Sequence, residues 1–202
     1  DTYYDETHKF KTEYYSLPVN IKEPDLSEYT NSEASIRRER IEKLINDLCK
    51  ATAKGEKIED MLDLNAFARF MLANDLSLNQ EIGHPKSTFL FNENEKSEDS
   101  KLKFGPIWDF DWAFGYEDGG KKYCYSQTMA SVLKTNFGAF SFFRDLTSYE
   151  TFKKHYYKAW VEFINNNSID ELFDYIDHYY SFAESSFENN RYAPNNSYGF
   201  TE

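Results

Sequence analysis

Residues 103–115 read KFGPIWDFDWAFG and constrain the fold of this chain more than any other stretch. If they form a strand, alternate side chains share a face, so one face carries Ile107, Asp109 and Asp111. The other face carries Trp108, Phe110 and Trp112, each worth about 1.5–3 kcal/mol when buried. Carboxylates two positions apart on a strand have Cα atoms roughly 6.5–7 Å apart, so both can reach one hard cation. The stretch therefore predicts an acidic metal-binding pair on a strand anchored by its aromatic face.

The composition describes a folded, acidic protein. Hydrophobic residues make up 40% of the 202 residues and aromatic residues 18%, which is enough for a core and too aromatic for a disordered chain. Asp and Glu outnumber Lys and Arg by 35 to 23, which gives a formal net charge of -12. Such a field repels nucleic-acid phosphates and anionic lipids but attracts divalent metal ions. We therefore expect one domain over residues 1–202 and no nucleic-acid partner.

The cysteines and the first residues bear on compartment and processing. Cys49 lies in an amphipathic helical pattern that favours a small core residue, whereas Cys124 could be exposed in a loop. Neither belongs to a C-x-x-C pattern, so no zinc site or disulfide framework is predicted. The sequence has no apolar run of the roughly 18 residues that indicate a transmembrane helix. The opening Asp1-Thr2 matches neither a signal peptide nor an initiator methionine, so we expect a piece of a longer, processed protein.

Two helices are predicted in the first part of the chain, after an irregular entry segment over 1–30. Apolar residues at helical spacing predict a helix over 32–54, and Gly55 is well placed to end it as a C-cap. A second helix is predicted from the N-cap Asp63 to about residue 76. Its apolar residues lie on several sides, which is typical of a buried, central helix.

A β-hairpin is predicted next. Its strands cover 87–91 and 101–110, and the polar segment 92–100 joins them. Gly105-Pro106 and Gly115 mark sharp changes of backbone direction on either side of the acidic pair. The hairpin would therefore carry the candidate site.

The last part of the chain is predicted to be helical after a loop over 118–136. Ser148 can cap one helix, and a capping box over 168–171 opens another that runs to about residue 189. An apolar stripe on this last helix predicts a packed core face rather than a ligand site; it consists of Leu172, Tyr175, Ile176, Tyr179, Phe182 and Phe187. The expected fold class is thus mainly α (α+β), a helical lobe with a small antiparallel hairpin.

A polar turn leads into the predicted hairpin. Asn79 and Glu81 end the buried helix, and His84-Pro85-Lys86-Ser87 enters the first strand. A carboxylate, an imidazole and an ammonium group so close together could act as general base, phosphate ligand and positioning group. A helix-to-strand loop whose polar groups face water explains the same residues, and the turn alone does not decide between them.

The acidic pair also has a simpler explanation, as solvated surface charge. Its aromatic neighbours argue against that explanation, because burying them would partly desolvate the carboxylates and so favour a bound cation. Mg²⁺ is usually held by one or two carboxylates together with substrate phosphates. The sequence contains no H-E-x-x-H, G-x-S-x-G, Walker A or G-x-G-x-x-G motif, and its histidines lack metal-ligand spacing.

Together, Asn79-x-Glu81, His84-Pro85-Lys86-Ser87 and Gly105-Pro106-Ile107-Trp108-Asp109-Phe110-Asp111-Trp112 resemble the spore coat protein H (CotH) kinase family. The resemblance covers roughly residues 30–195 and extends to secreted or lipoprotein members from gut anaerobes such as Bacteroides. It implies an atypical protein kinase that transfers the γ-phosphate of ATP to secreted proteins.

The resemblance also implies roles for single residues. Asp109 matches the metal-binding aspartate of the kinase D-F-G motif, with Asp111 as its companion. Glu81 sits where active members carry an aspartate as catalytic base, and Ser87 sits near the asparagine that would hold a second metal ion. Asn79, Lys86 and Ser87 would then contribute to cofactor binding.

The chain departs from the family pattern in three ways. Glu81 is longer than aspartate, and a base misplaced by about 1 Å can cost around 10²-fold in rate. Ser87 is a weaker metal ligand than an amide carbonyl. Neither a glycine-rich phosphate loop nor a strand lysine with a helix glutamate precedes the helical part, so the chain resembles a C-terminal lobe.

We therefore expect the C-terminal lobe of an exported kinase, located outside the cell or at its surface. In the full-length protein it would bind Mg²⁺ or Mn²⁺ with ATP and phosphorylate hydroxyls of a secreted protein, while the isolated lobe would have little activity and need no cofactor to fold. A catalytically degenerate pseudokinase lobe that binds surface proteins is the alternative, favoured by Glu81 and Ser87. A D-x-D metal–sugar-nucleotide site is a third possibility, which the lack of a surrounding α/β pattern disfavours.

Overall fold

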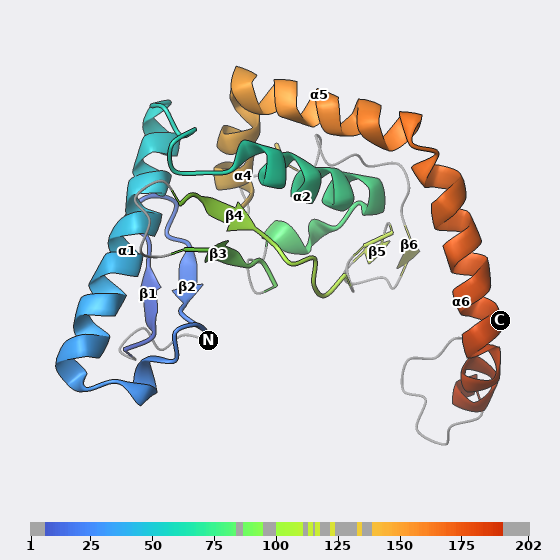
Figure 1. Ribbon diagram of the computed structural model, residues 1–202, viewed down its shortest axis with the longest axis horizontal. Helices are drawn as coiled ribbons and strands as arrows, with labels where there is room; N and C mark the ends of the chain where they lie inside the picture. The colour runs from blue at the N-terminus through green and yellow to red at the C-terminus, as the bar shows by residue number, and fades with distance from the viewer. Residues whose placement is uncertain are drawn as a thin grey trace. The chain divides into compact units, whose positions relative to one another are not determined.

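The computed structural model describes residues 7–83, 87–94, 100–110, 113–114, 116–117, 122–123, 133–134 and 139–191. Helices dominate them, and the strands form short antiparallel pairs, which confirms the mainly α fold class (Figure 1). The chain divides into two compact units, Asp1–Ala159 and Trp160–Glu202. Whether they form one domain stays a prediction. Among the described helices, none is long and apolar enough to cross a bilayer.

The entry segment is more regular than predicted. Strand β1 (Lys9–Lys11) pairs antiparallel with β2 (Pro18–Asn20), with Phe10 opposite Val19, and the short helix η1 (Leu26–Glu28) follows. Strands of three residues are too short for an alternating pattern to stand out in the sequence. A small core of its own holds the segment on the next helix; its buried members are Phe10, Ile21, Leu26 and Ala34.

Helix α1 (Asn31–Lys54) confirms the first predicted helix. Thr30 and Glu33 form a reciprocal capping box at its start, and Gly55 ends it in the left-handed conformation with a φ of 65°. Cys49 is fully buried, as predicted, and burial raises the pKa of its thiol to about 12. The helix packs against η1 and α4.

Helix α2 (Leu64–Ser77) confirms the second predicted helix and forms the centre of the core. Asp63 is its N-cap and accepts hydrogen bonds of 3.0 Å from the backbone N–H groups of Asn65 and Ala66. Phe67 is fully buried, and its ring packs against those of Phe104, Phe143 and Phe152.

The predicted hairpin forms with shorter strands. Strand β3 (Leu90–Asn92) pairs antiparallel with β4 (Leu102–Phe104), so the strand predicted over 101–110 was wrong beyond Phe104. The reason lies in the next two residues: Gly105 adopts a φ of 134°, and Pro106 has no N–H to donate to a ladder. The acidic stretch is therefore a loop.

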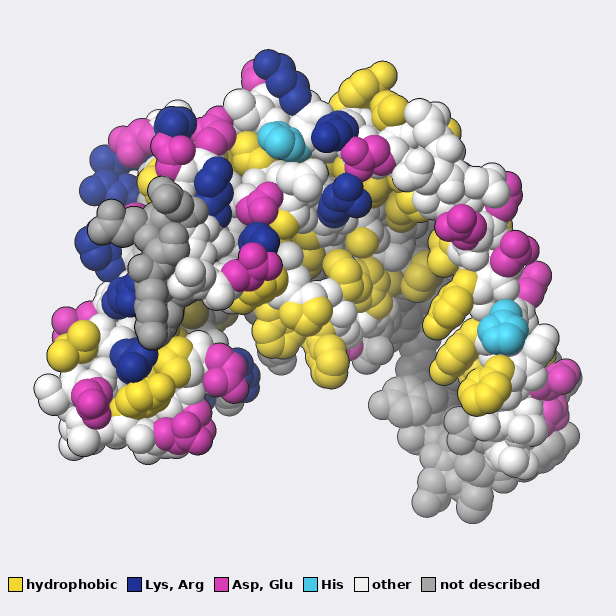
Figure 2. Space-filling view, viewed as in Figure 1, with side chains coloured by type: hydrophobic (Ala, Val, Ile, Leu, Met, Phe, Trp, Pro, Cys, Tyr) yellow, Lys and Arg dark blue, Asp and Glu magenta, His cyan; other side chains and the backbone are white. Residues whose placement is uncertain are grey.

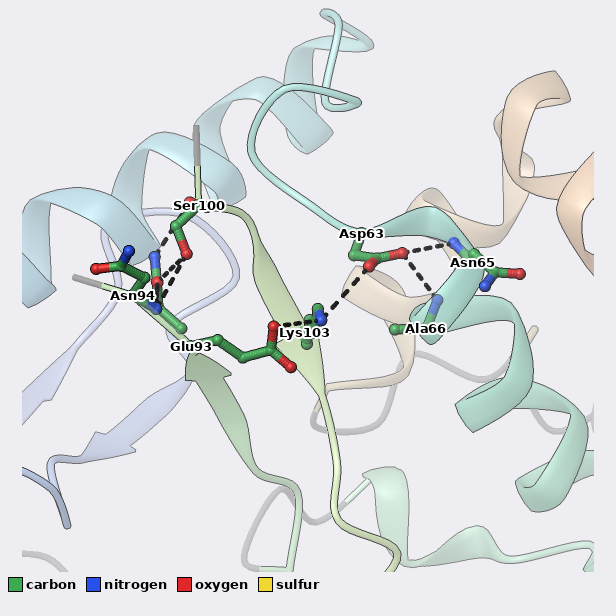
Figure 3. Close-up of polar contacts among 8 residues, drawn as sticks. Asp63, Asn65, Ala66, Glu93, Asn94, Ser100 and Lys103 are labelled. Carbon is green, nitrogen blue, oxygen red and sulfur yellow. Dashed lines mark hydrogen bonds and ion pairs between the residues drawn. The ribbon is translucent and has the colours of Figure 1, made fainter. Parts of the chain in front are cut away.

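A charged cluster ties the hairpin to the start of α2 (Figure 3). Lys103 Nζ lies 2.7 Å from Glu93 Oε2 and 4.0 Å from Asp63 Oδ2, and the bond to Glu93 raises the pKa of Lys103. Backbone bonds add to this, since Leu102 N–H donates to Met61 O at 2.8 Å and Leu102 O accepts from Asp63 N–H at 2.9 Å. These contacts fix the position of the hairpin relative to the start of α2.

Segment 118–136 was predicted to be a loop and falls largely outside the described residues. Within it, β6 (Lys122–Tyr123) pairs with β5 (Tyr116–Glu117). Helix α4 (Phe140–Ser148) was not predicted, and Ser148, predicted to cap the following helix, is its last residue. Helix α5 (Glu150–Asn165) follows after one intervening residue.

Helix α6 (Ser168–Arg191) forms as predicted, but its packing does not. The stripe predicted to be a core face is exposed, from 48% at Leu172 to 80% at Phe182. Figure 2 shows hydrophobic side chains along one side of this helix and acidic ones along the other. The prediction of a buried face was therefore wrong for this structure.

Candidate functional site

The candidate site begins where α2 ends. Leu78 closes the helix in the left-handed conformation with a φ of 49°, and the short helix η2 (Gln80–Gly83) follows at once. Asn79 N–H donates to Asn74 O at 2.9 Å, which folds the turn back onto the helix. Glu81 is half-buried on this turn.

Two buried amides hold the turn. The Asn74 side chain is fully buried and donates to Phe70 O at 2.8 Å. Its oxygen accepts a 3.1 Å bond from the side-chain amide of Asn79, which is 3% exposed. The oxygen of Asn79 in turn accepts from Glu81 N–H at 3.1 Å. A hydrogen-bonded chain thus runs from α2 to the backbone of Glu81.

The far end of the turn is held by α4. Gly83 O accepts from Ala139 N–H at 3.0 Å, just before α4 begins. A Cβ at Gly83 would lie under 3.0 Å from three atoms of the Phe140 ring. Only glycine allows this close approach without a shift of the ring.

Asp109 lies in the loop after β4 and close to the polar turn. Ser87 Oγ donates to Asp109 Oδ2 at 3.0 Å, across 22 positions of sequence. Asp109 is exposed and has a φ of 56°, a left-handed conformation that aspartate tolerates better than most residues. Further on, Phe114 N–H donates to Ser77 O at 2.5 Å, which ties the segment to the end of α2. The loop thus brings the predicted Asp109 and Ser87 together.

The aromatic residues beside Asp109 do not form the predicted buried face. Trp108 is 62% exposed and meets Phe89 edge-to-face, with ring centroids 6.5 Å apart. Phe110 is half-buried, and Trp112 lies outside the described residues. Figure 2 shows hydrophobic side chains gathered on the first unit, below the place that α2 has in Figure 1. The anchoring role predicted for Trp108 was therefore wrong, because the stretch is not a strand.

A narrow pocket unites the turn and the loop. It is lined by Phe70, Asn74, Asn79, Glu81, Ile82, Ser87, Thr88, Trp108 and Phe110. Its interior has room for about one water molecule. The predicted site residues Asn79, Glu81 and Ser87 thus share one pocket, while Asp111, His84 and Lys86 lie outside the described residues. Asn74 was not predicted as a site residue. Its signal in the sequence is an amide among the apolar residues of a predicted buried helix.

A larger hollow of about 430 Å³ lies by the start of α2 and includes none of the predicted site residues. Its lining is mostly charged and polar and contains the pair Lys103–Glu93. Within the described ranges, no group of three or more His, Cys, Asp or Glu side chains could hold a metal ion. A metal site among the described residues would therefore need a further ligand, such as a bound phosphate or the Asp111 carboxylate.

The residues at Asp109 fit a bound Mg²⁺. Neighbouring oxygen ligands of an octahedral Mg²⁺, at metal–oxygen distances of about 2.0–2.1 Å, lie about 2.9 Å apart. The distance of 3.0 Å between Ser87 Oγ and Asp109 Oδ2 is close to that spacing. A shared cation would be bound by a lone pair of the neutral Ser87 hydroxyl, with its proton turned away, and by the Asp109 carboxylate, at little change in the distance between the two oxygens.

Comparison with known proteins places the chain in a family. Neither the curated proteins nor the solved structures contain a significant match. The sequence model of a family described as CotH kinase protein matches residues 5–200, almost the whole chain. That the chain is a C-terminal lobe, and of a Bacteroides-like type, stays a prediction. The chain belongs to the CotH kinase protein family.

Proposed function

We propose that this chain is the kinase lobe of an exported protein that binds Mg²⁺ or Mn²⁺ with ATP and phosphorylates hydroxyls of a secreted protein. Family membership supports a kinase-like protein. The observation that carries the proposal is the pocket in which Glu81 and Ser87 meet, with Ser87 bonded to Asp109. Export rests on the sequence resemblance alone.

In the proposed site, Asp109 and Ser87 hold the metal ion, with Asp111 as a further ligand and Lys86 near the phosphates. The metal ion, when bound, neutralises charge on the phosphates of ATP. Exposure of Asp109 supports this role, because a ligand can reach the carboxylate from solvent.

Glu81 is the proposed general base. The water-sized space that it lines beside Ser87 is of the right size for a substrate hydroxyl. As that oxygen bonds to the γ-phosphorus, its proton passes to the Glu81 carboxylate and ADP leaves. The space is far too small for a nucleotide, so ATP would lie outside it, over the exposed side of Asp109.

Phosphate transfer from radiolabelled ATP to a generic protein substrate such as casein, with Mg²⁺ or Mn²⁺, tests the proposal in the full-length protein, because the isolated lobe is expected to have little activity. Asp109→Asn and Glu81→Gln should each remove incorporation, whereas Asp170→Asn, which neutralises an exposed acid on α6, should not. Equal activity of Asp109→Asn and the wild type would refute the metal site.

The alternative is a pseudokinase lobe that binds surface proteins. It is favoured by Glu81, which sits where active members of the family carry an aspartate, and by Ser87, which sits near the family's asparagine. It predicts that metal–ATP raises the melting temperature of the wild type but not of Asp109→Asn, with no incorporation in either. Incorporation of phosphate by the wild type therefore separates the two functions.

A further inference from the structure

We infer that Asn74 and Asn79 are positioning residues that hold Glu81 for catalysis. The inference rests on the proposed role of Glu81 and adds the device that fixes it. The two side chains form a hydrogen-bonded chain that starts on the α2 backbone at Phe70 O and ends on Glu81 N–H.

The hydrogen-bonded chain of the two amides has only one possible direction. Phe70 O can only accept, so Asn74 must present its NH₂ to it and its oxygen to Asn79. Asn79 must then donate with its NH₂, which turns its own oxygen toward Glu81 N–H, a group that can only donate. Because both ends are backbone groups, the whole chain is satisfied by two primary amides in this order.

The burial of both amides shows that they are not ordinary surface residues. Asn74 is 0% and Asn79 3% exposed, on and just after a helix whose other buried residues are mostly apolar. A buried amide is unfavourable unless its groups are bonded, and a fully bonded polar network rigidifies its surroundings. Asn74 bonds to Asn79, and Asn79 bonds to Glu81 N–H, so the buried amides serve the turn.

The opposite side of the turn is fixed too. Gly83 O accepts from Ala139 N–H at 3.0 Å, and Gly83 packs against the Phe140 ring. Glu81 thus sits between two fixed points of backbone. This matters for a glutamate, whose side chain has one more rotatable bond than aspartate, because a fixed backbone limits the positions that its carboxylate can reach.

This role differs from binding of the cofactor by Asn79. The side-chain oxygen of Asn79 accepts from Glu81 N–H, and its NH₂ group donates to Asn74. A positioning residue should lower kcat and leave the KM for ATP unchanged, whereas a cofactor ligand should raise that KM.

Asn79→Ala tests the inference by two readouts, hydrogen exchange and steady-state kinetics. We expect the Glu81 amide proton to exchange at least about 10-fold faster, while amides in the middle of α2 keep their protection. We also expect kcat to fall by about 10- to 100-fold, with the KM for ATP within about 2-fold of wild type. Asn65→Ala, an exposed amide on the same helix, should change neither.

Asn79→Asp adds a readout that a purely structural role would not move. It retains the size and the acceptor for Glu81 N–H but loses the NH₂ group that donates to Asn74, and its negative charge disfavours the ionised form of Glu81 and so raises the pKa of that carboxyl. Since the base must be ionised, the acid limb of the kcat–pH profile should shift to higher pH.

An unchanged exchange rate at Glu81 in Asn79→Ala, or a raised KM for ATP at constant kcat, would overturn the inference. An unshifted acid limb in Asn79→Asp would also overturn it. A full-length wild type that incorporates no phosphate, with faster exchange at Glu81 in Asn79→Ala, would reject the proposed function while supporting the positioning of this turn.

Discussion

The two sides of the candidate site are built differently. On one side, Glu81 stands on a turn held by the buried amides of Asn74 and Asn79 and by the start of α4. On the other side, Asp109 and Trp108 lie exposed in a loop. The first side is part of the core, and the second is open to a ligand. Substitutions on the first side should therefore reduce stability, and those on the second should change function with little effect on stability.

The largest effect on stability is expected within α2, the helix that the Glu81 turn follows. Phe67 is fully buried in α2 among three aromatic rings, so Phe67→Ala should lower the free energy of unfolding by about 3–5 kcal/mol. Urea denaturation measures it. Phe182→Ala is the matched control, since Phe182 is 80% exposed and its truncation should change stability by no more than about 0.5 kcal/mol. Equal losses would contradict the contrast between these helices.

A smaller loss is expected where the turn meets α4. Gly83→Ala places a methyl group against the Phe140 ring and should cost about 1–3 kcal/mol. If that contact causes the loss, the variant with both Gly83→Ala and Phe140→Leu should lose less free energy of unfolding than the two single variants together. A double-mutant cycle measures the difference. Simple additivity would show that the close approach does not hold the turn.

The exposed side should tolerate truncation. Trp108 is 62% exposed and contacts Phe89 by its edge, so Trp108→Ala should cost less than about 1 kcal/mol. Thermal unfolding followed by circular dichroism measures the change. A loss of 3 kcal/mol or more, the range expected of a buried Trp, would mean that the loop is anchored in the core after all.

The sequence predicted the parts of the fold that depend on local signals. The caps Asp63 and Gly55 mark helix ends through short-range hydrogen bonds and backbone conformation, and both were placed correctly. It failed where longer-range packing decides. The stripe on α6 has the periodicity of a buried face, but periodicity does not tell which surface covers it.

The candidate site was predictable in part for the same reason. The sequence pointed to Asp109, Glu81 and Ser87, and the structure brings the last two into one pocket, with Ser87 bonded to Asp109. The strand geometry predicted for Asp109 was wrong, because Gly105 and Pro106 end β4 before the acidic residue. The contact between Ser87 and Asp109 spans 22 positions of sequence. The bonds of Asn74 depend on the geometry of a turn that no sequence pattern predicts.

The smallest effect on stability and the largest on function should coincide at Asp109. Asp109→Asn keeps the size of an exposed side chain and should change the free energy of unfolding by no more than about 0.5 kcal/mol. Isothermal titration calorimetry of Mg²⁺–ATP into wild type and Asp109→Asn measures the central claim directly. We expect Mg²⁺–ATP to bind the wild type, and to bind the variant with an affinity at least about 10-fold weaker, because a charged metal ligand is lost. Equal affinity in the two proteins, or no binding to the wild type, would contradict it.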